Sequence, residues 1–183
     1  DAYLQEEIRR KGVTDIADLQ PVQEGLYLWQ GDITTLKCGA IVNAANSALL
    51  GCFQPLHSCI DNLIHSRSGI QLRLACDRLM REQGHEEEVG KAKITPAFNL
   101  PARYVLHTVG PAVYGRVTER DCGLLASCYR SRLELAVENG CKSIAFCCIS
   151  TGVFHFPNRK AAETAVTAVR DYLAGDCSIE KVI

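Results

Sequence analysis

The chain has 183 residues, which is close to the size of a single domain. Its 47% hydrophobic and 22% charged residues are ordinary for a globular protein and exclude a disordered or fibrous chain. The 20 Lys and Arg against 21 Asp and Glu give a net charge of −1, which argues against a general attraction to nucleic acid or to an anionic membrane.

The cysteine content and the first residues indicate where the protein works. The start, DAYLQEEIRRKG, lacks the apolar core of a signal peptide, and no stretch approaches the roughly 20 apolar residues of a membrane span. We therefore expect a cytoplasmic location and no membrane partner. In a reducing compartment the 10 cysteines indicate free thiols or metal ligands rather than disulfides. Several lie in apolar runs, where they are expected to be small buried hydrophobic residues: Cys38, Cys128, Cys141, Cys147 and Cys148.

The first half of the chain is predicted to contain a helical extension, two strands and a helix. Residues 1–20 are expected to form the N-terminal extension, and the absence of an initial Met indicates a trimmed start. Leu26–Trp29 and Ala40–Ala45 are apolar runs that predict strands, and a helix is expected over about 60–82, with a break at Gly69.

The second half has the clearest α/β pattern. Three apolar runs predict buried strands: Tyr104–Val109, Ser143–Ile149 and Ile179–Ile183. Helical periodicity covers about 122–139, and Pro157 opens a second helix that ends before Gly175. Strands that alternate with helices of this length imply parallel pairing, so we expect one α/β domain over 21–183. The last run has no stop signal and is expected to be a strand cut short at the chain end.

Three segments follow predicted strands and are candidates for a ligand site, because ligands bind at the carboxyl ends of parallel strands. They are Gly31–Thr34, Asn43–Asp61 and Ser150–Phe156. In the third, Gly152 lies in a strand-to-helix turn before Pro157, where backbone N–H groups can point at a phosphate. The same features also fit a plain connection between a strand and a helix.

The middle segment contains a possible metal site. Its sequence GCFQPLHSCIDN places Cys52, His57 and Cys59 within eight residues, and thiolates and imidazoles are the donors that zinc prefers. The spacing is not that of a zinc finger, and three protein ligands with an open position are typical of a catalytic zinc. The alternative is two buried cysteines and a loop histidine.

These segments resemble the macrodomain family, which binds ADP-ribose. The resemblance rests on Gly31–Thr34, NAANS at 43–47, VLHTVGP at 105–111 and CISTGVFHFP at 148–157, and it runs from about Leu26 to the end of the chain. It implies a three-layer α/β/α sandwich with a mixed, mostly parallel central sheet.

One departure from the family pattern points to a particular branch. Ordinary macrodomain hydrolases have a Gly-rich loop of the type GGGGVDG after NAANS, where this chain has GCFQPLHSCIDN. This substitution and the N-terminal extension resemble the zinc-dependent branch, whose members are similar to hydrolases that remove mono-ADP-ribose from proteins. The resemblance implies Zn²⁺ as cofactor and Cys52, His57 and Cys59 as its ligands.

The resemblance also implies roles in ligand binding. Asp32 would accept a hydrogen bond from the adenine amine, with backbone contact from Ile33, or would serve only to cap a turn. Asn46 would be directed at the distal ribose or would be a turn residue, and Asp61 aligns with the aspartate of the VDG loop. The loop around the diphosphate would consist of Ser150, Thr151, Gly152, Val153 and Phe154.

Four further residues complete the comparison with the family. Phe156 would pack on the distal ribose or anchor its loop in the core. His155 stands where many macrodomains have Gly, which argues against a close backbone approach there. His107 is expected to be a hydrogen-bonded core histidine, and His65 fits either a structural or a functional role. The aromatic residue that stacks on adenine in this family follows the last strand, after Ile183.

The predicted function is therefore zinc-dependent hydrolysis of the bond between a protein and mono-ADP-ribose. Asn46 and Asp61 are the predicted catalytic residues, and an Asp/Glu-linked substrate is favoured because a carboxylate leaving group needs no strong general acid. The alternatives are an ADP-ribose reader without catalysis and an O-acetyl-ADP-ribose deacetylase. A nucleic-acid partner is disfavoured by the near-neutral charge and by the lack of a basic stripe with interleaved aromatic residues.

Overall fold

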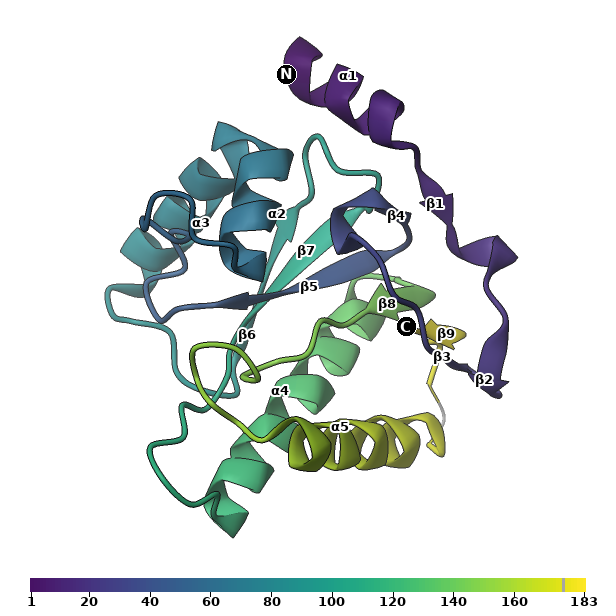
Figure 1. Cartoon of the computed structure of the whole chain (residues 1–183), viewed down its shortest axis with the longest axis vertical. Helices are drawn as coiled ribbons and strands as arrows, with labels where there is room; N and C mark the ends of the chain where they lie inside the picture. Colours follow the sequence, from purple (N-terminus) through teal and green to yellow (C-terminus); the bar gives the residue numbers. More distant parts are fainter. Residues whose placement is uncertain (176) are drawn as a thin grey trace.

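A computed structural model describes residues 1–175 and 177–183 (Figure 1). Its centre is a 7-stranded sheet in the order β2-β3-β9-β8-β5-β7-β6. The strands are β2 (Pro21–Gln23), β3 (Leu26–Tyr27), β5 (Ala40–Ala45), β6 (Ala92–Pro96), β7 (Tyr104–Val109), β8 (Ser143–Ala145) and β9 (Lys181–Val182). The inner strands pair in parallel, whereas β2 and β6 are antiparallel to their neighbours at the two edges.

Helices cover both faces of this sheet (Figure 1). They are α2 (Ile60–Ser68), α3 (Ile70–Gln83), α4 (Glu119–Glu138) and α5 (Asn158–Leu173), whereas α1 (Ala2–Lys11) stands apart from the sheet (Figure 1). Helices α4 and α5 pack on one face, and α2 and α3 pack on the other. Among the described residues, none of these helices is long and apolar enough to cross a membrane.

The alternation of side chains in β5 explains the two cores. Val42 packs toward α4 and α5, whereas Ile41 packs toward α2 and α3, and both are fully buried. A parallel strand that is covered on both faces needs apolar residues at successive positions, as AIV supplies here. The predicted three-layer α/β/α fold is confirmed.

The N-terminal residues are held against the rest of the chain by a second, two-stranded sheet. Strand β1 (Thr14–Asp15) pairs in parallel with β4 (Leu36–Lys37), which follows the short 3₁₀ helix η2 (Ile33–Thr35). A further 3₁₀ turn, η1 (Ile16–Asp18), follows β1. The predicted extension is therefore helical only over α1.

The structure corrects several predicted boundaries. The strand expected over 26–29 ends at Tyr27, and the strand expected over 143–149 ends at Ala145. The edge strands β2 and β6 were not predicted, because PVQ and AKITP mix polar and apolar residues without a buried run. The helix break at Gly69 is confirmed, since its φ of 99° lies in the left-handed region that favours glycine.

Candidate active site

A cavity of about 430 Å³ opens at the carboxyl ends of β5 and β7. Two of the three predicted loops meet there, namely the loop after β5 and the loop after β8. About 100 residues separate these two loops along the chain. The lining residues are Ala44, Ala45, Asn46, Cys52, His57, Ser58, Cys59, Ile60, Asp61, Gly110, Cys147, Cys148, Ser150, Thr151, Gly152, Val153 and Phe154.

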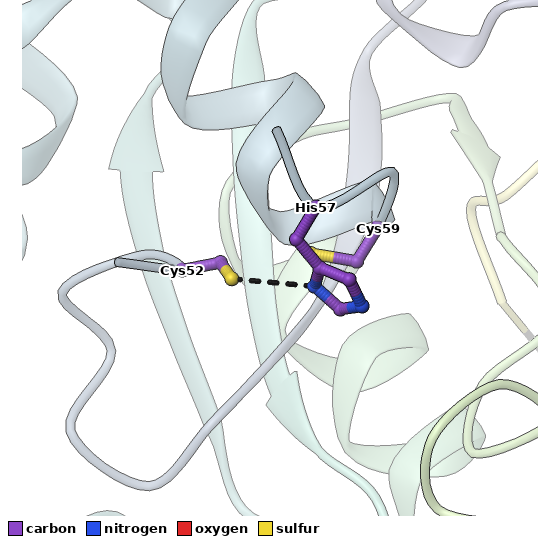
Figure 2. A group of neighbouring side chains, drawn as sticks. All are labelled: Cys52, His57 and Cys59. Carbon is purple, nitrogen blue, oxygen red and sulfur yellow. Dashed lines mark hydrogen bonds between the residues drawn. The ribbon is translucent and has the colours of Figure 1, made fainter. Parts of the chain in front are cut away.

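The three predicted metal ligands lie together (Figure 2), and all three line this cavity. The donor atoms of Cys52, His57 and Cys59 lie within 4.8 Å of one another, and Cys52 Sγ is 3.4 Å from His57 Nδ1. Zinc binds thiolate sulfur at about 2.3 Å and imidazole nitrogen at about 2.0 Å, so donors at this separation can share one ion. The type and the spacing of the three donors therefore fit zinc.

The start of α2 holds this trio in place. Cys59 is the N-cap of α2, and its Sγ accepts a hydrogen bond from the Asn62 backbone N–H at 3.4 Å. The Asn62 side chain donates to the His57 carbonyl oxygen at 2.9 Å. Burial raises the pKa of the Cys59 thiol, and the neighbouring Cys52 and Asp61 raise it further. A bound cation would offset this effect by stabilising the thiolate.

Asp61 brings a carboxylate to the cavity from the first turn of α2. It is only 4% exposed, and its Oδ1 accepts a hydrogen bond from Asn43 Nδ2 at 2.8 Å. Burial raises the pKa of Asp61 and outweighs the lowering effect of the Asn43 hydrogen bond. His65 Nε2 lies 3.6 Å from the same oxygen, but burial lowers the pKa of His65 to about 4. His65 is therefore neutral at pH 7 and does not form an ion pair with Asp61.

Asn46 lines the cavity and also shapes the loop that carries the metal donors. Its Oδ1 accepts from the Ala48 backbone N–H at 3.1 Å, and its Nδ2 donates to the Gly51 carbonyl oxygen at 3.1 Å. The two roles considered for Asn46, a turn residue and a residue of the ligand site, are thus compatible in one conformation.

The loop after β8 lines the cavity with residues 150–154. Ser150 has a left-handed φ of 65°, and its buried Oγ has no hydrogen-bond partner among the described residues. A Cβ at Gly110 would collide with that Oγ and with Ile149 Cγ2, so both side chains would have to shift. His155 also has a left-handed φ, of 56°. Gly adopts this left-handed conformation more readily than a residue with a side chain does.

Not every predicted ligand-binding residue reaches the cavity. The Phe156 side chain is 1% exposed and packs in the core on the α4 and α5 side, whereas Phe154 lines the cavity. Phe156 is therefore an anchor for its loop, which was the alternative to ribose packing. Asp32 and Ile33 also lie outside the cavity lining.

Asp32 is the N-cap of the short helix η2, which agrees with the capping role considered as the alternative to adenine binding. Its Oδ1 accepts from the Thr34 backbone N–H at 3.0 Å at the start of η2. Lys11, at the end of α1, approaches Asp32 Oδ2 to 3.4 Å. The pKa of Asp32 is lowered because these hydrogen bonds and the Lys11 charge outweigh the opposing effect of burial. Asp32 is therefore ionised at pH 7.

Sequence patterns missed several residues of the cavity. Cys148 was expected to be buried, but it is exposed and lines the cavity together with Cys147. The reason is that β8 ends at Ala145, so 146–149 already belong to the loop. Gly110 follows β7 and could have been identified from the GP pair that ends that strand.

Comparison with known proteins agrees with this geometry. A family model described as Macro domain matches residues 42–165, and the chain belongs to this macrodomain family. Over 187 residues it is 62% identical to a "Protein-ADP-ribose hydrolase" from Treponema medium, with 100% of this chain and 72% of that protein covered. It is 52% identical over 185 residues to a "Protein-ADP-ribose hydrolase" from Staphylococcus aureus strain MSSA476, with 100% and 69% covered.

A solved structure extends the comparison to three dimensions. The Trypanosoma brucei macrodomain in complex with ADP-ribose matches with a TM-score of 0.78 and 32% identity, covering 98% of this chain and 78% of the other. The fold around the cavity is therefore that of a known ADP-ribose-binding macrodomain.

Proposed function

We propose that this chain is a zinc-dependent hydrolase that removes mono-ADP-ribose from modified proteins. The observation that carries the proposal is that the Cys52, His57 and Cys59 donors line the same cavity as the Asp61 carboxylate. A protein that only binds ADP-ribose has no use for three metal-ligating side chains beside a buried acid. The names of the two bacterial relatives support the same activity.

The lining of the cavity suggests how ADP-ribose would lie. The diphosphate would contact the loop 150–154, where the unpartnered Ser150 Oγ is available as a donor. The distal ribose would then lie between Asn46, Asp61 and the three metal donors. The adenine would extend toward Asp32, outside the cavity lining.

Hydrolysis takes place at C1″ of the distal ribose, through a transition state with oxocarbenium character. When held by Cys52, His57 and Cys59, a zinc ion supplies a Lewis acid beside this ribose. Asp61 accepts a proton from the attacking water, because Oδ1 is occupied by Asn43 and Oδ2 is left for the ligand. Asn46 orients the ribose from the turn that leads into the loop of the metal donors.

The presence of a single carboxylic acid among the described residues of the cavity favours an ester-linked substrate. Water oxygen forms the new bond to C1″, and the bond from C1″ to the protein breaks with its electron pair on the leaving oxygen. One water proton passes to Asp61 and the other stays on the product hydroxyl. Asp61 is the single carboxylic acid among the described lining residues, so no second acid protonates the leaving group. A leaving carboxylate of Asp or Glu does not need one.

A panel of three modified proteins tests the proposal. They carry ADP-ribose on Asp/Glu, Ser or Arg, and release of ADP-ribose is measured with and without a chelator. We expect release from the Asp/Glu-linked protein only, with loss of activity on chelation and recovery when zinc is restored.

Three results would contradict parts of this proposal. Binding of ADP-ribose without release from any linkage would identify a reader. Full activity after verified removal of the metal would contradict the role of zinc, and release from the Ser- or Arg-linked protein would contradict the ester preference.

A further inference from the structure

Behind Asp61, a chain of buried polar side chains runs from the edge strand β6 across β7 and β5 to α2. It starts at Thr95 in β6, passes through His107 in β7 and Asn43 in β5, and ends at Asp61. The exposed fractions are 2%, 0%, 0% and 4% in that order. Buried polar groups are costly unless they are hydrogen-bonded, so the direction of each bond in this chain is tightly constrained.

The carboxylate end of the chain fixes the direction of every bond. Asn43 Nδ2 donates one N–H to Asp61 Oδ1 at 2.8 Å and lies 3.3 Å from His107 Nδ1, which takes the second N–H. His107 Nδ1 must then be unprotonated, and its proton lies on Nε2, which is 2.9 Å from Thr95 Oγ1. The Cys76 thiol is a more distant neighbour of Nε2, at 3.7 Å.

A reversed Asn43 amide would be unfavourable at both of its contacts. Its oxygen would then face the carboxylate oxygen of Asp61 and the lone pair of His107 Nδ1. Burial keeps His107 neutral by lowering its pKa to about 3, so Nδ1 remains an acceptor at pH 7. His65 and Arg132 are the charged or titratable groups that lower this pKa further.

We propose that Asn43 and His107 are positioning residues, which fix the Asp61 carboxylate so that Oδ1 is held from behind and Oδ2 faces the distal ribose. Thr95 acts one step further away, since its hydroxyl accepts the Nε2 proton of the tautomer that Asn43 imposes on His107. This inference rests on the proposed function, because it assigns Asp61 to the reacting end of ADP-ribose. It also gives a role beyond stability to a histidine that the sequence indicates only as part of the core.

A matched pair of substitutions tests the proposal. Thr95→Val removes the acceptor of the His107 Nε2 proton. Thr108→Val makes the same change in a buried threonine next to His107 whose hydroxyl takes no part in this chain of hydrogen bonds. We expect Thr95→Val to lower kcat on the ADP-ribosylated protein about fivefold and Thr108→Val to leave it unchanged. Asn43→Asp, which places a carboxylate against Asp61, should lower kcat about 100-fold, the scale of a misplaced reacting group.

Two further measurements separate positioning from a loss of folding. The ADP-ribose Kd and the KM should change less than about twofold in Thr95→Val, because neither Thr95 nor His107 lines the cavity. Nitrogen-15 NMR of the unsubstituted protein should show His107 with a protonated Nε2 and an unprotonated Nδ1, and this readout does not depend on activity. A protonated Nδ1 would overturn the inference, and so would equal kcat values for Thr95→Val and Thr108→Val.

These outcomes also distinguish the inference from the proposed function. If the unsubstituted protein releases no ADP-ribose, the proposed function fails and the positioning role falls with it, even where NMR finds the expected tautomer. If release is observed and Asn43→Asp retains full kcat, only the positioning role is wrong.

Discussion

At the scale of single residues, the cavity brings together side chains with different tasks. Cys52, His57 and Cys59 offer soft donors, whereas Asp61 offers one buried carboxylate with one oxygen already engaged. Asn46 closes the turn that leads into the donor loop and also faces the cavity. Because these tasks are separate, substitutions should divide into those that change the rate and those that change binding.

Removal of one metal donor should affect rate more than affinity. We expect Cys52→Ala to lower turnover of the ADP-ribosylated protein by at least about 100-fold, because the metal acts where charge develops in the transition state. The ADP-ribose Kd should change by less than about threefold, since the diphosphate loop does not depend on this thiol. Steady-state kinetics and calorimetry on the same preparation measure the two quantities.

A matched control for this experiment is Cys122→Ala. Cys122 is also half-buried, but it lies in α4 and does not line the cavity. It should retain both activity and affinity. Full activity in Cys52→Ala, with elemental analysis showing that zinc is lost, would contradict the catalytic role of the metal.

At the scale of elements, short segments rather than long helices carry the candidate site. Helix α2 is capped by Cys59, which is also one of the three proposed metal ligands, so helix initiation and the proposed metal binding depend on one residue. The 3₁₀ helix η2 likewise starts with Asp32, which is the predicted adenine contact. Replacing Cys59 or Asp32 with alanine would therefore remove a helix cap as well as the predicted contact to the metal or to adenine.

Two substitutions at Asp32 separate these effects. Asp32→Asn keeps an oxygen that can accept from the Thr34 N–H and loses only the charge, whereas Asp32→Ala loses both. Both variants should weaken ADP-ribose binding by about 1–3 kcal/mol, the scale of a charge-assisted hydrogen bond. Only Asp32→Ala should also lower the free energy of unfolding, by about 1 kcal/mol.

Calorimetry and urea denaturation check the two parts of this prediction. Lys11→Met is the control for the ion pair at Asp32 and should leave the helix cap intact. An unchanged ADP-ribose affinity in Asp32→Asn would show that Asp32 serves only as a cap.

At the scale of the whole molecule, the sequence was informative where a pattern is local. The apolar runs of β5 and β7, the break at Gly69 and the spacing of the three metal donors are all visible in short stretches. The chain from Thr95 to Asp61 is not visible in this way, because it joins side chains of three neighbouring strands and of α2 that are far apart in the sequence. The core position of Phe156 and the exposure of Cys148 likewise depend on where a strand ends and a loop turns.

The buried histidines make global stability depend on pH. The pKa of His107 is lowered to about 3 and that of His65 to about 4, in both cases mainly because burial disfavours the charged ring. Each remains neutral in the folded protein while it gains a proton in the unfolded chain below pH 6.5. The free energy of unfolding is therefore not reduced by these histidines above pH 6.5. It decreases as the pH falls below 6.5, and below the folded pKa values the two histidines cause no further decrease.

Between pH 7 and pH 5 this linkage should lower the free energy of unfolding by about 2 kcal/mol for each histidine. Asp61 has the opposite influence, since its raised pKa favours the folded state at acid pH. Urea denaturation at the two pH values measures the loss. His65→Gln, which leaves the Asn43 and His107 contacts in place, should reduce the difference by about half. If the unsubstituted protein is equally stable at both pH values, or if His65→Gln has the same pH dependence, then His65 does not contribute as a buried neutral group.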